Sequence, residues 1–127
     1  MIINCFPFYN ELDLLEIRLE TLAPLVDGFV LVEADESYSG KPKELIFQGN
    51  KSRFERFNVQ AISIPAFPAE MTDPWQREVY ARNQLFEGLK DFHLAASDVV
   101  LLSDVDEIPR PELVQRCAHS LTQEPPG

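Results

Sequence analysis

The chain has 127 residues, of which 45% are apolar, so it is long enough for one domain with a sizeable core, and its composition is neither disordered nor fibrous. Its 21 acidic and 11 basic residues leave a formal charge of −10, which argues against a nucleic-acid backbone as the main partner. No apolar run approaches the roughly 20 residues that span a bilayer, and no basic segment precedes residues 1–3 as in a signal peptide, so we expect a soluble, cytoplasmic protein.

The first third of the chain predicts a strand, a helix and a second strand. Residues 1–5 (MIINC) form a short apolar run of the kind that makes a buried strand. Asn10 is a plausible N-cap of the helix, and Pro24 ends its pattern. Four leucines recur at helical spacing between them: Leu12, Leu15, Leu19 and Leu22. Residues 28–34 (GFVLVEA) are apolar almost throughout, which indicates a strand covered on both faces, as in a parallel sheet.

The remainder predicts two more strands and a last helix. Residues 35–53 are polar and turn-rich, so we expect a long loop with one short element at residues 44–47. Residues 59–64 (VQAISI) and 98–103 (DVVLLS) predict the third and fourth strands. The last helix begins at Pro111 and has a clean apolar face. That face comprises Leu113, Val114, Cys117, Ala118 and Leu121.

The helix between the third and fourth strands has the clearest start signal. Asp73 can cap it, Pro74 suits the first helical position, and Gln76 completes a capping box. Its apolar stripe, which we expect to face the core, comprises Trp75, Val79, Phe86 and Leu89. Arg82 falls on the same stripe. Either its stem packs while its guanidinium reaches solvent, or the guanidinium binds a diphosphate or orders the acidic residues that follow the fourth strand.

Alternating strands and helices predict a doubly wound α/β fold with a mostly parallel sheet. In such sheets, ligands bind beyond the carboxyl ends of the strands. Polar residues follow three of the predicted strands, at residues 6–11 (FPFYNE), 33–37 (EADES) and 103–107 (SDVDE). We therefore expect a binding site where these three segments converge.

The acidic segment after the fourth strand is the strongest candidate for chemistry. Asp104 and Asp106 are two positions apart, so in an extended chain both carboxylates point the same way and repel each other. A hard divalent cation such as Mn²⁺ or Mg²⁺ would remove the repulsion, and a nucleotide diphosphate could fill its open coordination positions. The alternative is a solvated loop, in which Glu107 only adds favourable negative charge near the start of the next helix.

Glu33 is a second candidate, because it ends a strongly apolar strand, where a charge costs free energy. Its carboxylate could accept hydrogen bonds from a nucleotide base or ribose. Alternatively, it pairs with a neighbouring lysine or arginine, or faces water. The residues themselves do not decide between these readings.

The sequence resembles a known family, the β-1,4-mannosyl-glycoprotein β-1,4-N-acetylglucosaminyltransferases (glycosyltransferase family 17). That family includes the enzyme that adds bisecting N-acetylglucosamine to N-glycans. The resemblance is carried, in order, by CFPFYNELDLLEIRLETL, VDGFVLVEADESYSGKPKEL, WQREVYARN and VVLLSDVDEIPRPE. It implies a Rossmann-like GT-A fold that uses a UDP-sugar, most simply UDP-N-acetylglucosamine, with a mannose-like sugar or another glycan as acceptor.

The resemblance also implies roles for individual residues. Asp104 and Asp106 match the Asp-x-Asp metal motif of the family, with Asp104 also among the donor-binding residues. The remaining donor-binding candidates are Phe6, Pro7, Glu33, Arg82 and Asn83. Glu107 is a candidate catalytic base for an inverting transfer, in which an acceptor hydroxyl attacks and UDP departs.

Family catalytic domains are longer than this chain, which resembles their nucleotide-binding half. We therefore expect a partial GT-A domain over residues 1–122 and a tail or truncation point at residues 123–127. Animal members of the family carry a membrane anchor. If this chain has lost such an anchor, we expect the Golgi lumen as its location. The alternative function is a non-catalytic remnant that binds nucleotide weakly or self-associates as a homo-oligomer. A haloacid-dehalogenase-type phosphatase is a more distant alternative, because such enzymes also place Asp-x-Asp after an apolar strand.

Overall fold

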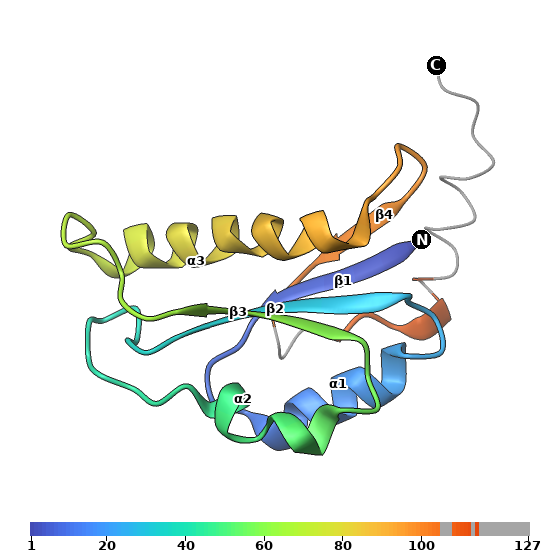
Figure 1. Ribbon diagram of the computed structural model, residues 1–127, viewed down its shortest axis with the longest axis horizontal. Coiled ribbons are helices and arrows are strands. Elements are labelled where there is room, and N and C mark those ends of the chain that lie inside the picture. The colour runs from blue at the N-terminus through green and yellow to red at the C-terminus, as the bar shows by residue number, and fades with distance from the viewer. Residues whose placement is uncertain (105–107, 113, 115–127) are drawn as a thin grey trace.

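Four parallel strands form the sheet of this computed structural model, which describes residues 1–104, 108–112 and 114 (Figure 1). The strands are β1 (Ile2–Pro7), β2 (Gly28–Ala34), β3 (Val59–Ile64) and β4 (Val99–Leu102). Their order across the sheet is β3-β2-β1-β4, and every neighbouring pair is parallel. The predicted α/β, Rossmann-like fold is thereby confirmed.

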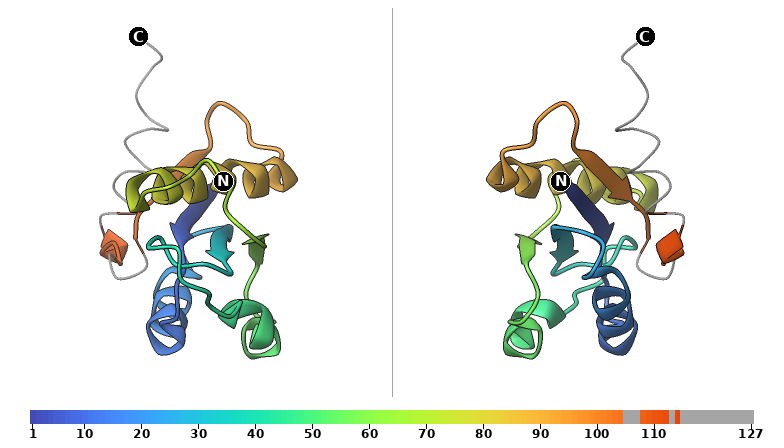
Figure 2. Two further views of the ribbon diagram at one scale, coloured as in Figure 1. Left: turned by 90° about the vertical axis from the view of Figure 1, so that its left-hand side faces the viewer. Right: turned by 90° about the vertical axis from the view of Figure 1, so that its right-hand side faces the viewer.

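Helices cover both faces of this sheet. They are α1 (Leu12–Leu22), α2 (Ile46–Gly49), the 3₁₀ helix η1 (Lys51–Phe54), α3 (Pro74–Leu89) and the 3₁₀ helix η2 (Lys90–Phe92). Figure 1 shows α1 and α2 on one face and α3 on the other, and Figure 2 shows the same layers from two sides. In the described parts of the chain, no helix has the length and apolar character needed to cross a membrane.

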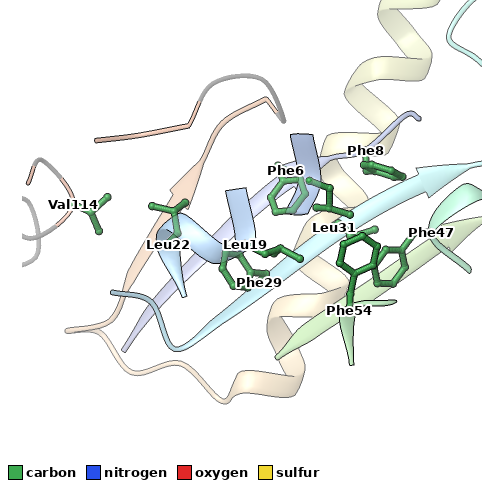
Figure 3. Close-up of a cluster of buried hydrophobic side chains, with 10 residues drawn as sticks. Phe6, Phe8, Leu19, Leu22, Phe29, Leu31, Phe47, Phe54 and Val114 are labelled. Atoms are coloured by element: carbon green, nitrogen blue, oxygen red, sulfur yellow. The ribbon is translucent and has the colours of Figure 1, made fainter. Parts of the chain in front are cut away.

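Two apolar clusters, one on each face, hold the layers together. On the α1 face, Phe6 and Leu31 of the sheet pack with Leu19 of α1 and with the stacked rings of Phe47 and Phe54, whose centroids are 5.7 Å apart (Figure 3). On the α3 face, alternate residues of β1 and β2 pack against the helix. They are Ile3, Cys5, Val30, Val32 and Ala34. Each fully buried large side chain stabilises the fold by about 1.5–3 kcal/mol.

The start of α3 is as predicted. The Asp73 carboxylate accepts a hydrogen bond from the Gln76 amide at 2.9 Å, and the Gln76 side chain accepts one from the Asp73 amide. The start of α1 is not, because Asn10 is not its N-cap. Glu11 holds that position without a side-chain capping bond, and its carboxylate instead lines a cavity described below.

The predicted inward stripe of α3 is wrong at Trp75, Val79 and Phe86, which are exposed, whereas Leu89 is partly buried and packs against the cluster on this face. Trp75 is 70% exposed and Phe86 is 57% exposed, whereas Ala81, Leu85 and Gly88 are buried. The reason is close packing on β2. A Cβ atom at Gly88 would lie 2.5 Å from Val30 Cγ1, so the side of the helix that carries Gly88 faces the sheet, while Trp75 and Phe86 face out.

The fourth strand is an outer strand in the described sheet and is only partly buried, with Val100 and Leu102 exposed. It pairs with β1, and the last bond of that ladder runs from the Ser103 amide to the Cys5 carbonyl at 3.1 Å. The Cys5 thiol is buried, which raises its pKa to about 12 and keeps it protonated and unreactive at neutral pH.

After β4, Val114 is buried in the cluster on the α1 face, in agreement with the predicted apolar face of the last helix. Leu113 and residues 115–127 lie outside the described residues, so the rest of that helix and the predicted boundary at residue 122 stay predictions.

Candidate functional site

A cavity of about 540 Å³ opens at the carboxyl edge of the sheet. β1 lies between β2 and β4 in the sheet. The chain passes from β1 to β2 on one side of β1, and from β3 to β4 on its other side. The carboxyl end of β1 is therefore the switch point at which doubly wound sheets bind ligands. All three predicted segments contribute to the walls. At the end of β1 and just after it, the lining residues are Pro7, Phe8, Tyr9 and Glu11. The end of β2 and the loop that follows it contribute Val32, Glu33, Ala34, Glu36, Ser37, Tyr38, Ser39 and Lys43. α3 contributes Pro74 and Ala81, and Asp104 lines the cavity after β4.

The loop after β2 forms one wall and is tied to α3. The Ser37 amide donates to the Lys41 carbonyl at 2.8 Å, which closes a turn through Gly40, whose φ of 86° favours glycine. Arg77 of α3 donates to the Tyr38 carbonyl at 2.7 Å. Tyr38 also lines the cavity, and burial raises the pKa of its hydroxyl, which is a neutral hydrogen-bond donor.

Asp104 meets two arginines that come from opposite faces of the sheet. Arg82 of α3 donates to Asp104 Oδ1 at 2.5 Å and to Glu78 Oε1 at 3.3 Å. Burial works to lower the pKa of Arg82, but Asp104 and Glu78 outweigh it and raise that pKa. Arg18 of α1 donates to the Asp104 carbonyl oxygen at 2.8 Å. Two positively charged side chains therefore lie at the start of the acidic segment. They offset part of the repulsion that we expect between its carboxylates.

Arg18 is the residue that sequence reasoning missed. It is buried beside Leu15, Leu19 and Leu22 on the inward face of α1. The signal was present in the spacing, because a cation three positions after Leu15 and four before Leu22 falls within the apolar stripe.

Glu33 is buried, and its carboxylate binds α2. Its two oxygens accept hydrogen bonds from the Phe47 and Gln48 amides, each at 3.0 Å, so it serves as a distant cap for this short helix. Lys43 Nζ lies 3.9 Å from Glu33 Oε1. Pairing with a neighbouring lysine was one of the alternatives left open, and Glu33 also lines the cavity.

Lys43 connects several parts of the cavity wall. Its ammonium group donates to the Ala34 carbonyl at 3.2 Å and lies 5.2 Å from the centroid of the Tyr9 ring. Desolvation lowers the pKa of Lys43, against the opposing influence of nearby carboxylates. This partly buried cation therefore lies beside the acidic residues of the cavity wall and offsets part of their negative charge.

Two shielded carboxylate oxygens have no hydrogen-bond partner within the described chain, Glu11 Oε2 and Asp35 Oδ1. Glu11 lines the cavity. An unsatisfied shielded acceptor costs free energy, and a hydroxyl or N–H group of a ligand would satisfy it.

The other predicted site residues divide into three groups. Pro7 lines the cavity, whereas Phe6 is in the core beneath the guanidinium of Arg18. Asn83 is exposed and lines a separate hollow of about 240 Å³ with Trp75 and Val79. Asp106 and Glu107 lie outside the described residues.

The predicted metal motif is therefore described only at Asp104. Its carboxylate is an oxygen donor of the kind that Mn²⁺ and Mg²⁺ prefer, and it lines the cavity. Residues 1–104, 108–112 and 114 contain no group of three side chains suited to hold a metal ion. A full ligand set at this place would need Asp106 or oxygen atoms of a bound ligand.

Comparisons with known proteins agree with the resemblance in the sequence. Residues 1–121 match the model of glycosyltransferase family 17. Rat and human proteins named beta-1,4-mannosyl-glycoprotein 4-beta-N-acetylglucosaminyltransferase are each 32% identical over 115 residues, and the mouse protein of that name is 31% identical. The match covers 85% of this chain but only 21–22% of those relatives, so the chain spans about a fifth of their length. No solved structure matches significantly.

Proposed function

This chain belongs to glycosyltransferase family 17, and we propose that it forms the donor-binding part of an enzyme that transfers N-acetylglucosamine from UDP-N-acetylglucosamine to a mannose-like sugar acceptor. The observation that carries the proposal is the position of Asp104, held by Arg82 beside a cavity at the switch point of the sheet.

The cavity walls offer contacts that a nucleotide diphosphate could use. Tyr9 and Tyr38 each offer an aromatic ring and a hydroxyl group. Small-ligand sites commonly combine apolar surface with a few polar groups in this way. Glu11 offers an unpartnered acceptor for a hydroxyl or N–H group of the donor. Arg82 supplies positive charge at the place where a diphosphate would lie if it joined Asp104.

Asp104 and Asp106 would hold Mn²⁺ or Mg²⁺. When bound, such an ion neutralises charge that develops on the departing diphosphate. The chain's own contribution is to orient Asp104 through Arg82 and to keep a closed turn beside the cavity. Glu107 is the proposed base that takes the proton from the acceptor hydroxyl.

A second candidate function is self-association without catalysis. Five large apolar side chains on α3 and β4 are exposed: Trp75, Val79, Phe86, Val100 and Leu102. Such residues often mark contact surfaces. A mass that rises with concentration in light scattering, with no nucleotide binding, would favour this function over donor binding.

The deciding experiment is a calorimetric titration of the full chain with UDP in the presence and absence of Mn²⁺. We expect binding that Mn²⁺ strengthens, and loss of that strengthening in the double variant Asp104→Ala, Asp106→Ala. Asp13→Ala is the matched control, because the Asp13 side chain is 94% exposed and pairs with Arg53 on the surface. A folded wild-type chain that releases no heat would refute donor binding. Competition by UDP-N-acetylglucosamine, UDP-glucose and GDP-mannose would then rank donors.

A further inference from the structure

Arg18 is a cation with no exposed surface, and three of its nitrogens have partners on other segments. Nε donates to Asn4 Oδ1 at 2.9 Å, and Nη1 donates to the Asp104 carbonyl at 2.8 Å. Nη2 donates to Ser103 Oγ. The guanidinium carbon also lies 4.5 Å from the centroid of the Phe6 ring, in cation–π contact.

Packing alone does not explain an arginine at this position. Its helical neighbours on the inward face are leucines, and an aliphatic side chain would fill the same place without the desolvation penalty of a buried charge. The hydrogen bonds of the guanidinium must offset that penalty. Two of them end on Ser103 and Asp104, at the point where the polypeptide leaves β4.

The end of β4 needs such support because β4 is an outer strand whose side chains Val100 and Leu102 are exposed. Asn4 of β1 is fully buried and extends the support along the strand. It accepts the bond from Arg18 and donates through Nδ2 to the Leu101 carbonyl at 3.2 Å. Arg18 and Asn4 thus connect α1 and β1 to the last residues of β4.

We propose that Arg18 is a positioning residue that fixes the backbone at Ser103 and Asp104, so that the Asp104 carboxylate enters the cavity where Arg82 meets it. The inference rests on the proposed donor binding. Arg82 acts on the carboxylate, whereas Arg18 acts on the carbonyl of the same residue. The guanidinium reaches the three separate acceptors from three different nitrogens, whereas a lysine would have to donate every hydrogen bond from one nitrogen.

The test compares UDP binding with and without Mn²⁺, by calorimetry on the full chain, in Arg18→Lys, in Ser103→Ala and in both together. We expect Arg18→Lys to lower, by about tenfold or more, the factor by which Mn²⁺ raises the UDP affinity. The UDP affinity without metal should stay within about twofold of the wild-type value. Ser103→Ala should have a smaller effect in the same direction. The double variant should resemble Arg18→Lys, because both changes remove the same contact.

The matched control is Arg53→Lys, since Arg53 also contacts α1, through Asp13 and Glu16, but on the surface. It should leave the strengthening by Mn²⁺ unchanged. If Arg18→Lys lowers only the melting temperature and keeps the full Mn²⁺ effect, Arg18 is merely structural and the proposal is wrong. Should Arg18→Lys fail to fold, Ser103→Ala decides by the same criterion.

A second measurement does not depend on nucleotide binding. Hydrogen exchange of the Ser103 amide, which donates to the Cys5 carbonyl, reports on the order of this backbone in the ligand-free chain. In Arg18→Lys we expect this amide to exchange about tenfold faster while the amides of β2 are unchanged. Unchanged Ser103 exchange would overturn the proposal. A wild-type chain that binds no UDP would instead refute the proposed function, while the exchange result would still decide whether Arg18 orders this backbone.

Discussion

Arg82 Nη2 lies 2.5 Å from Asp104 Oδ1, so the middle of α3 is joined to the first residue of the acidic segment after β4. Both side chains are partly exposed, and Glu78 shares the guanidinium at 3.3 Å. The contact agrees with the reading in which Arg82 orders the acidic segment. It also means that a cation binding to Asp104 competes with an arginine already in place.

Replacing Arg82 by methionine should therefore affect the metal and the nucleotide in opposite directions. Mn²⁺ alone should bind a few-fold more tightly, because Asp104 loses a competing cation. UDP with Mn²⁺ should bind about tenfold more weakly, or about 1.4 kcal/mol, because a positive charge near the diphosphate is lost. Calorimetry with each ligand measures both effects.

Two variants sharpen the Arg82 experiment. Arg82→Lys keeps the charge without the planar fork and should retain part of the UDP affinity. Lys90→Met removes a cation of similar size just beyond α3, where Lys90 pairs with Glu87, and should change neither affinity. If Arg82→Met weakened Mn²⁺ binding and UDP binding together, Arg82 would not compete with the metal ion for Asp104.

Glu33 should be essential for stability. Glu33→Ala leaves the Phe47 and Gln48 amides without their acceptor and Lys43 without its close carboxylate. We expect the free energy of unfolding to fall by about 2–4 kcal/mol, measured by urea denaturation, and less in Glu33→Gln, which keeps an acceptor oxygen. Glu20→Ala, which removes an exposed partner of Arg56, should stay within about 0.5 kcal/mol. Equal effects of the two alanine variants would show that the cap of α2 is unimportant.

Gly88 should be intolerant of any side chain. Alanine normally stabilises a helix by about 1 kcal/mol relative to glycine. At Gly88 the added methyl group would lie 2.5 Å from Val30 Cγ1, so we expect a net loss of about 1–3 kcal/mol in unfolding free energy. Gly49→Ala is the control, because nothing lies within 4 Å of its Cβ position and no destabilisation is expected. A Gly88→Ala chain as stable as wild type would mean that α3 can move away from β2.

The orientation of α3 has a direct test in two truncations. Trp75→Ala should change the unfolding free energy by less than about 0.5 kcal/mol, because the ring is 70% exposed. Leu85→Ala should cost about 2–5 kcal/mol, because Leu85 is only 1% exposed. If Trp75→Ala were instead more destabilising than Leu85→Ala, Trp75 would face the core, as the apolar spacing predicts.

The types of element were predictable because their signals are local. The capping box of Asp73 and Gln76, the leucine spacing of α1 and the apolar run of β2 act over a few residues, and each is found in the structure. The place of the candidate site was predictable from a topological rule, since parallel strands bring their carboxyl ends to one edge. The cavity lies at that edge and is lined by Pro7, Glu33 and Asp104.

Partners and faces were decided by tertiary contacts. Arg18 and Asp104 are 86 positions apart, and Arg82 and Asp104 are 22 apart, so no local pattern records that they meet. On α3, the apolar spacing predicts that Trp75 and Phe86 face the core, but they are exposed, and the close approach of Gly88 to Val30 turns a different side of the helix to the sheet. Helix caps and apolar runs depend on residues a few positions apart, whereas burial and ion pairing depend on which surfaces the packed layers bring together.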